Sequence, residues 1–116
     1  MTVQAQNFEM FQGDVKQIII QVTDENDAIL NLTGYDIIWV WYRQTNKEEV
    51  LRRTLGSGIT VPTPSNGLIV IDLLPADTES ILPNTYIHEC EISTGSTDRT
   101  TVTVGTVKIF YSKIKH

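Results

Sequence analysis

The stretch "YDIIWVWYRQ" (Tyr35–Gln44) decides what kind of fold this sequence forms. Successive side chains of a β-strand point to opposite faces of the sheet, so a strand with one buried face alternates apolar with polar residues. Here two tryptophans and an isoleucine share one face, whereas the other face carries Ile38, Val40 and Tyr42. The stretch therefore predicts a strand that is apolar on both faces, and the second face needs a role.

The same period of two runs through most of the chain. We predict strands over Val15–Thr23, Leu68–Leu73, Thr85–Thr94 and the segment "TTVTVGTVKIFYS", separated by clusters of Gly, Pro, Asn and Asp that favour turns. The segment Asn46–Thr54 could begin a helix, because Glu49 follows a possible asparagine cap, but its apolar residues fit a returning strand better. About seven or eight short strands predict an antiparallel β-sandwich in one domain over residues 1–116.

The last predicted strand contains a change of phase. Val102 and Val104 share one parity, whereas the apolar residues from Val107 to Tyr111 share the other, and Gly105 lies between them. A bulge or kink near Gly105 would keep all of these side chains on the core face.

The segment "ILPNTY" (Ile81–Tyr86) is typical of a corner where the chain crosses between two sheets. Tyr86 is placed like an immunoglobulin-fold tyrosine corner, whose hydroxyl group returns to nearby backbone. Between the sheets, Trp39 or Trp41 can fill the centre of the core, because a buried indole supplies a large apolar area. We also expect one helical turn between Asp77 and Ile81.

Composition limits the classes of partner. The 116 residues carry a net charge of −5, with a pI near 4.8. This negative net charge argues against a nucleic-acid or anionic-membrane partner, because binding to either requires a basic patch on the protein. A single cysteine permits no internal disulfide and favours folding in a reducing cytosol. The sequence begins with neither the basic start nor the apolar run of a signal peptide.

Residues that could carry chemistry are few, and we expect no enzyme activity, cofactor or metal. His88 lies on the same strand parity as Tyr86 and Cys90, so we interpret it as a histidine at the edge of the core, and Cys90 as a small buried apolar residue. Neither has a predicted nucleophile or base beside it. One acidic cluster could bind calcium through Asp24, Glu25 and Asp27, but its sequence is more typical of a solvated hairpin turn.

Several segments, including "FQGDVKQIIIQVTDEN", "LNLTGYDIIWVWYR" and "NGLIVIDLLPADTESILPNTY", resemble the immunoglobulin-like N-terminal domain of phage baseplate upper proteins. The positions that carry the resemblance are turn and corner residues: Gly13–Asp14, Leu32–Gly34, Asn66–Gly67, Asp77–Thr78, Leu82–Pro83 and Thr85–Tyr86. The resemblance implies an immunoglobulin-like sandwich in a phage or prophage structural protein, which folds in the host cytoplasm and is assembled into the virion tail or baseplate.

The second apolar face is the predicted site of assembly. If the tryptophan face enters the core, the outward apolar residues are Ile19, Ile38, Val40, Tyr42, Leu68 and Val70. A partner that buried such side chains fully would gain about 1.5–3 kcal/mol for each, enough to hold a homo-oligomer or a neighbouring virion protein. Two alternatives stay open. The N-terminal arm or the Asn46–Thr54 hairpin covers this face, or the inward and outward sides are exchanged in one strand.

Two other functions compete with the tail or baseplate assignment. A capsid or head–tail decoration protein of the same fold would share every feature used above except the resemblance to baseplate domains. A carbohydrate-binding module for host adsorption would need exposed aromatic side chains as sugar platforms, and Tyr42 and Tyr111 are the candidates.

Overall fold

The computed structural model describes residues 4–95 and 98–114. Its secondary structure is almost entirely strand. The elements in chain order are β1 (Gln4–Ala5), β2 (Phe8–Phe11), β3 (Lys16–Gln21), β4 (Asp36–Arg43), β5 (Glu49–Leu55), β6 (Gly58–Thr60), the 3₁₀ turn η1 (Pro64–Asn66), β7 (Leu68–Leu73), α1 (Pro75–Thr78), β8 (Asn84–Ser93) and β9 (Arg99–Phe110). No helix in the described ranges is long and apolar enough to cross a membrane.

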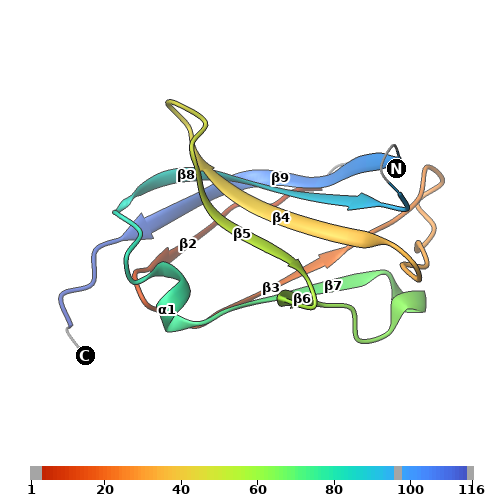
Figure 1. Cartoon of the computed structure of the whole chain (residues 1–116), viewed down its shortest axis with the longest axis horizontal. Coiled ribbons are helices and arrows are strands. Elements are labelled where there is room, and N and C mark those ends of the chain that lie inside the picture. The colour runs from red at the N-terminus through yellow and green to blue at the C-terminus, as the bar shows by residue number, and fades with distance from the viewer. Residues whose placement is uncertain (1–3, 96–97, 115–116) are drawn as a thin grey trace.

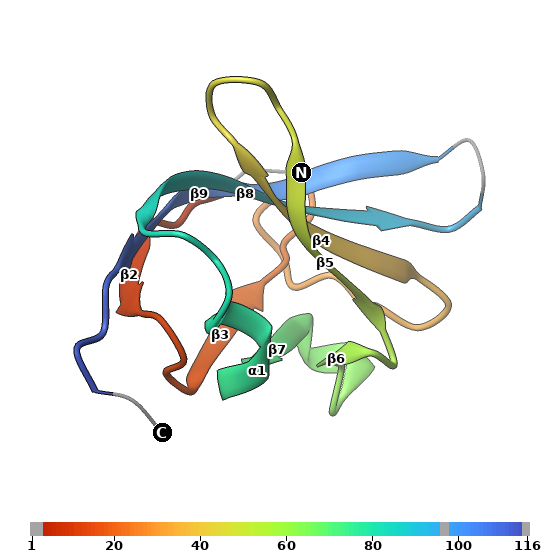
Figure 2. The same cartoon turned by 60° about the vertical axis from the view of Figure 1, so that its left-hand side comes forward.

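The strands form one continuous sheet that curls into two layers. In the order β1-β9-β8-β4-β5-β6-β7-β3, the strands from β9 to β5 make one layer, and β6, β7 and β3 make the other (Figure 1). Figure 2 shows the same chain curving round, so that the sheet nearly closes into a barrel. The predicted all-β fold of the sandwich or barrel type is therefore confirmed. The finer immunoglobulin-like assignment stays a prediction.

The sheet is mixed, although we expected antiparallel pairing throughout. β1 and β2 both run parallel to β9, and β5 runs parallel to β6. Period-two patterns show which residues face the core, but they carry no information about strand direction, which depends on how the connections run. The hairpin predicted from Asn46–Thr54 is present, because β5 pairs antiparallel with β4.

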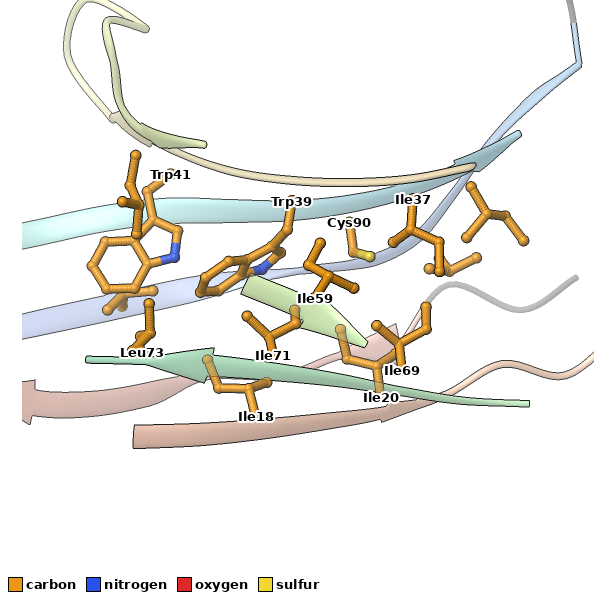
Figure 3. Close-up of a cluster of buried hydrophobic side chains, with 14 of the residues drawn as sticks. Ile18, Ile20, Ile37, Trp39, Trp41, Ile59, Ile69, Ile71, Leu73 and Cys90 are labelled. Atoms are coloured by element: carbon orange, nitrogen blue, oxygen red, sulfur yellow. The ribbon is translucent and has the colours of Figure 1, made fainter. Parts of the chain in front are cut away.

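The core lies between the two layers, where the inward residues of β4 meet those of β7 and β3. Figure 3 shows Trp39 and Trp41 pointing from β4 toward Ile71 and Leu73. Both indoles are fully buried, and their rings meet edge to face with centroids 5.4 Å apart. Large aromatic groups packed in this geometry add to the area they bury, so β4 anchors the core.

The change of phase in β9 occurs three residues earlier than predicted. Cys90 of β8 pairs with Thr103, whereas Glu91 pairs with Thr101, so the extra residue is Val102. The prediction that Val104 and Tyr111 face the core is therefore wrong. Val104 is half-buried on the outer side of the sheet, and Tyr111 lies beyond the end of β9 with 55% of its surface exposed.

Gly105 has a different role from the predicted kink. It is buried where the N-terminal arm, made of β1 and β2, runs along β9. A Cβ atom at Gly105 would lie 1.9 Å from the carbonyl oxygen of Gln6. The absence of a side chain at Gly105 lets the arm approach β9. The position of an alanine Cβ atom is fixed by the backbone, so no side-chain rotation would relieve this contact.

The corner between β7 and β8 joins the two layers. The helical turn begins at Pro75, two residues before the predicted start, and the Oδ2 atom of Asp77 accepts a 2.7 Å hydrogen bond from the amide of Leu74. Arg53 of β5 pairs with the other oxygen of Asp77. Buried Thr78 accepts a 3.0 Å hydrogen bond at its hydroxyl from the amide of Gly13. These contacts fix the end of the molecule that carries α1.

Tyr86 forms the tyrosine corner that the sequence predicts. Its side chain is fully buried, and its hydroxyl group donates a hydrogen bond to the carbonyl oxygen of Leu82, four residues earlier. Burial also raises the pKa of Tyr86, and the positive charge of Arg43 offsets only part of this increase. The phenol therefore stays protonated and keeps its role as a donor.

Candidate assembly surfaces

The outer face of β4 carries three of the predicted interface residues. Ile38, Val40 and Tyr42 all point away from the core and are half-buried. Their neighbours in register are mostly polar, because Val40 lies between Arg52 of β5 and Glu89 of β8. The flanking side chains cover part of each apolar group. The free energy available from burying these residues is therefore smaller than that of fully exposed side chains.

Hydrogen bonds order the polar groups on this face. The hydroxyl group of Tyr42 donates a 2.7 Å hydrogen bond to Oε1 of Glu89. Arg52 forms an ion pair with Glu49, with 2.8 Å between Nη2 and Oε1. Desolvation, together with the hydrogen bond to Glu89 and its negative charge, raises the pKa of Tyr42 to about 12. The face is thus an apolar row bordered by fixed charges, with a groove of about 620 Å³ along it.

Within residues 4–95 and 98–114, the N-terminal arm and the β4–β5 hairpin extend this sheet by strand pairing instead of lying over its outer face. The N-terminal arm pairs with the edge of β9, and the second strand of the β4–β5 hairpin lies beside β4 as β5. Ile38, Val40 and Tyr42 keep the outward orientation that the alternation predicts.

The remaining predicted interface residues lie on the opposite side of the molecule. Ile19 of β3 pairs with Val70 of β7, and Leu68 lies two residues before Val70 on the same face. Ile19 is 50% exposed, whereas Val70 and Leu68 are half-buried. Because β3 and β7 form the second layer, the six residues make two groups on opposite outer faces instead of one patch (Figure 1).

The largest gathering of exposed apolar side chains is at the end of the molecule that carries α1, which we call the α1 pole. Of nine large exposed apolar residues in the described ranges, six lie there, and their exposure ranges from 50% to 71%. They are Phe11, Val15, Leu74, Leu82, Tyr111 and Ile114. Strand periodicity could not predict this surface, because these residues lie in turns and at strand ends, where a period of two does not apply.

His88 has hydrogen-bond partners on both sides of its ring. The indole N–H of Trp39 donates to Nδ1 at 3.1 Å, so Nδ1 must be unprotonated, and Nε2 donates to the carbonyl oxygen of Gln6. Burial lowers the pKa of His88, against the opposing effect of the hydrogen bond to Gln6. A neutral histidine thus ties the core of β4 to the N-terminal arm, as a structural residue.

The low pKa of His88 makes stability depend on pH. The unfolded chain takes up a proton at this position near pH 6.5. The folded chain does so only at lower pH, so the unfolded state binds more protons between the two values. We expect the free energy of unfolding to fall as pH drops below about 6.5, by at most about 1.4 kcal/mol per pH unit. Urea unfolding at several pH values measures this, and an unchanged slope in His88→Gln would contradict it.

Cys90 and the acidic turn have structural roles. Cys90 is buried, and desolvation, reinforced by the charge of Glu91, raises the pKa of its thiol to about 12. One oxygen of Asp24 accepts hydrogen bonds from the amides of Asn26 at 2.8 Å and Ala28 at 3.0 Å, which closes the turn. Across residues 4–95 and 98–114, no group of three His, Cys, Asp or Glu side chains could hold a metal ion.

Tyr42 does not present an open platform for a sugar. Its hydroxyl group is bound to Glu89, and the Nζ atom of Lys47 lies 5.6 Å from the ring centroid. A cation over one ring face competes with a sugar for the same surface. Tyr111, the other candidate, belongs to the α1 pole.

Comparison with known proteins assigns no family. No family model and no curated protein matches the sequence.

Proposed function

We propose that this chain is a non-enzymatic structural component of a phage or prophage particle, located in the tail or baseplate, and that it acts through protein–protein contacts. The observation that supports an assembly role is the α1 pole, where six large apolar side chains are each at least half exposed. Large exposed apolar side chains gathered at one end of a molecule often mark a surface that meets another protein. The phage assignment is supported by the resemblance of the turn and corner residues to baseplate domains.

The α1 pole can supply a substantial part of a docking free energy. Burying the exposed half of a large apolar side chain yields roughly 1 kcal/mol, so six of them yield roughly 6 kcal/mol. Association costs about 4–15 kcal/mol in lost freedom of movement. The apolar residues therefore need polar contacts around them to hold a partner.

Immunogold electron microscopy on purified particles tests the proposal. Antibodies against the chain are expected to label the tail or its end, and gradient-separated tails are expected to contain the chain. Label confined to heads would favour a capsid or decoration protein. Particles that contain none of the chain would overturn the proposal.

A further inference from the structure

We propose that the free edge of β3 binds an extended segment of a neighbouring protein, which adds to the sheet as a strand antiparallel to β3. This inference rests on the proposed assembly role and names the chemistry of the partner's contact. That contact consists of backbone hydrogen bonds, alternating apolar and neutral polar side chains, and one basic side chain. The inference is carried by the backbone groups of β3 and by a hollow beside the start of that strand.

The backbone groups on one side of β3 are directed away from the sheet. β3 forms one end of the curled sheet, and β7 is the only strand that pairs with it in the described ranges. The amide of Val22, just after β3, donates a 2.8 Å hydrogen bond to the carbonyl oxygen of Gly67, just before β7. Residues of an antiparallel pair alternate between facing the partner strand and facing away from it. Counting back from Val22, the N–H and C=O groups of Gln17 and Ile19 therefore point away from β7.

The N-terminal arm meets this edge through the side chain of Gln6. Its Nε2 atom donates a long, exposed hydrogen bond of 3.4 Å to the carbonyl oxygen of Ile19, which agrees with the outward direction of that carbonyl group. Such a bond contributes little to stability, because water can replace the amide. The arm is nevertheless close to the edge, which favours a single extended segment as the occupant over the whole sheet of a second copy. The added strand would displace Gln6 and supply a backbone donor in its place.

The sequence of this edge favours the addition of a strand. Edge strands are commonly protected by charged side chains, by proline or by bulges. The residues from Gln17 to Gln21 read QIIIQ, and their register with β7 is unbroken, so this stretch has none of these features. Ile19, at its centre, is 50% exposed and presents a β-branched side chain to a partner strand. The matching partner is a strand of alternating β-branched and neutral polar residues.

A hollow of about 300 Å³ lies beside the start of β3, where it is also lined by β2. Phe11, Val15 and Phe110 supply apolar lining. Phe11 and Val15 also belong to the α1 pole, so the hollow connects that pole with the free edge of β3. A partner docked on the α1 pole can therefore continue along β3 as an extended segment.

The charges around the hollow specify one side chain of the partner. Glu9 and Asp14 line the hollow and are exposed. Lys16 lines it too, with its Nζ atom 5.5 Å from the centroid of the Phe8 ring, so two carboxylates accompany one ammonium group. An arginine suits such a site, because its apolar stem packs on the apolar lining and its guanidinium group pairs with a carboxylate. In a strand antiparallel to β3, this arginine lies at the carboxyl-terminal end.

Fluorescence anisotropy on the full chain tests the site, with a labelled, amidated peptide of alternating valine and threonine residues that ends in arginine. We expect saturable binding with a Kd below about 1 mM. Gln6→Ala should strengthen binding several-fold, because it removes the competing donor at Ile19. Ile19→Pro should weaken binding at least tenfold, since proline lacks the outward N–H but leaves the hydrogen bonds to β7 in place. Ile19→Thr, the matched control, keeps the N–H and a β-branched side chain and should bind like the wild type.

The basic contact has a test of its own. A peptide that ends in glutamate in place of arginine should bind the wild type several-fold more weakly. The double variant Glu9→Lys with Asp14→Lys should reverse this preference, because the hollow then carries only positive charges. A preference that the double variant leaves unchanged overturns the assignment of a basic side chain to the hollow.

Amide exchange measured by NMR keeps the proposal testable if Ile19→Pro disturbs folding, because it needs no variant. A saturating concentration of the arginine peptide should slow exchange at Gln17 and Ile19. It should leave exchange at Ile18 and Ile20 unchanged, because their amides already face β7. Absence of saturable binding at about 1 mM, or equal binding by Ile19→Pro and Ile19→Thr, overturns the proposal. A wild type that dimerises, and that loses the dimer in Ile19→Pro, also overturns it and assigns the edge to a second copy.

Failure of this site is distinguishable from failure of the proposed function. A chain that appears in purified tails but binds no strand peptide overturns the strand site and leaves the assembly role. A chain that binds the peptide but is missing from particles overturns the assembly role and leaves the strand site.

Discussion

Replacing Gly105 with alanine is expected to destabilise the fold by about 3 kcal/mol, the size of effect typical of overpacking against a rigid element. The new methyl group would lie 1.9 Å from the carbonyl oxygen of Gln6 and 2.9 Å from Nε2 of His88. Relief requires the N-terminal arm to move away from β9. The Gln6–His88 hydrogen bond and the 2.9 Å bond from the amide of Thr106 to Asn7 would then both be lost.

Urea denaturation of the variant measures this loss, with Gly95→Ala as the matched control. A Cβ atom at Gly95 meets nothing within 4 Å among the described residues, so that variant should stay within about 0.5 kcal/mol of the wild type. If Gly105→Ala were equally mild, the arm would not be docked as the structure shows.

Two tryptophan variants separate hydrogen bonding from packing in the core. Trp39→Phe is expected to lower the free energy of unfolding by about 3 kcal/mol, because it reduces buried volume and leaves Nδ1 of His88 without its donor. Trp41→Phe should lower it by about 1 kcal/mol. The indole N–H of Trp41 is buried and has no hydrogen-bond partner in the part of the chain that the structure describes, so its removal abolishes no bond.

Chemical denaturation of both variants in one buffer gives the comparison directly. Both side chains are fully buried and both rings shrink by the same atoms, so the difference between the variants reports the Trp39–His88 bond. Equal losses of unfolding free energy would show that packing alone accounts for the destabilisation. They would contradict the structural role assigned to His88.

The sequence predicted the features of the fold that depend on local alternation and on turn chemistry. The strand around Trp39 and Trp41, the corner at Tyr86 and the outward face of Val40 are all placed as the period of two requires. These features follow from side-chain direction, which is fixed residue by residue along a strand.

What the sequence did not predict depends on contacts between distant segments. The short strands β1 and β2 contain too few residues for a pattern, and they are held by pairing with β9, about a hundred residues away along the chain. The bulge at Val102 is visible only from its pairing with β8. The α1 pole is assembled from turns and strand ends that alternation cannot describe, so the most exposed apolar surface was the one least accessible to sequence reasoning.

The measurement that tests the central claim most directly is incorporation of surface variants into assembling particles. Leu74 and Leu82, at the α1 pole, are 59% and 62% exposed, so changing both to serine should affect stability little. Ile29 and Leu55, at the opposite end, are 54% and 43% exposed and provide the matched pair. We predict that Leu74→Ser with Leu82→Ser lowers incorporation at least tenfold, whereas Ile29→Ser with Leu55→Ser leaves it unchanged. Equal incorporation of the two pairs would contradict the account, because the apolar pole would then not be a docking surface.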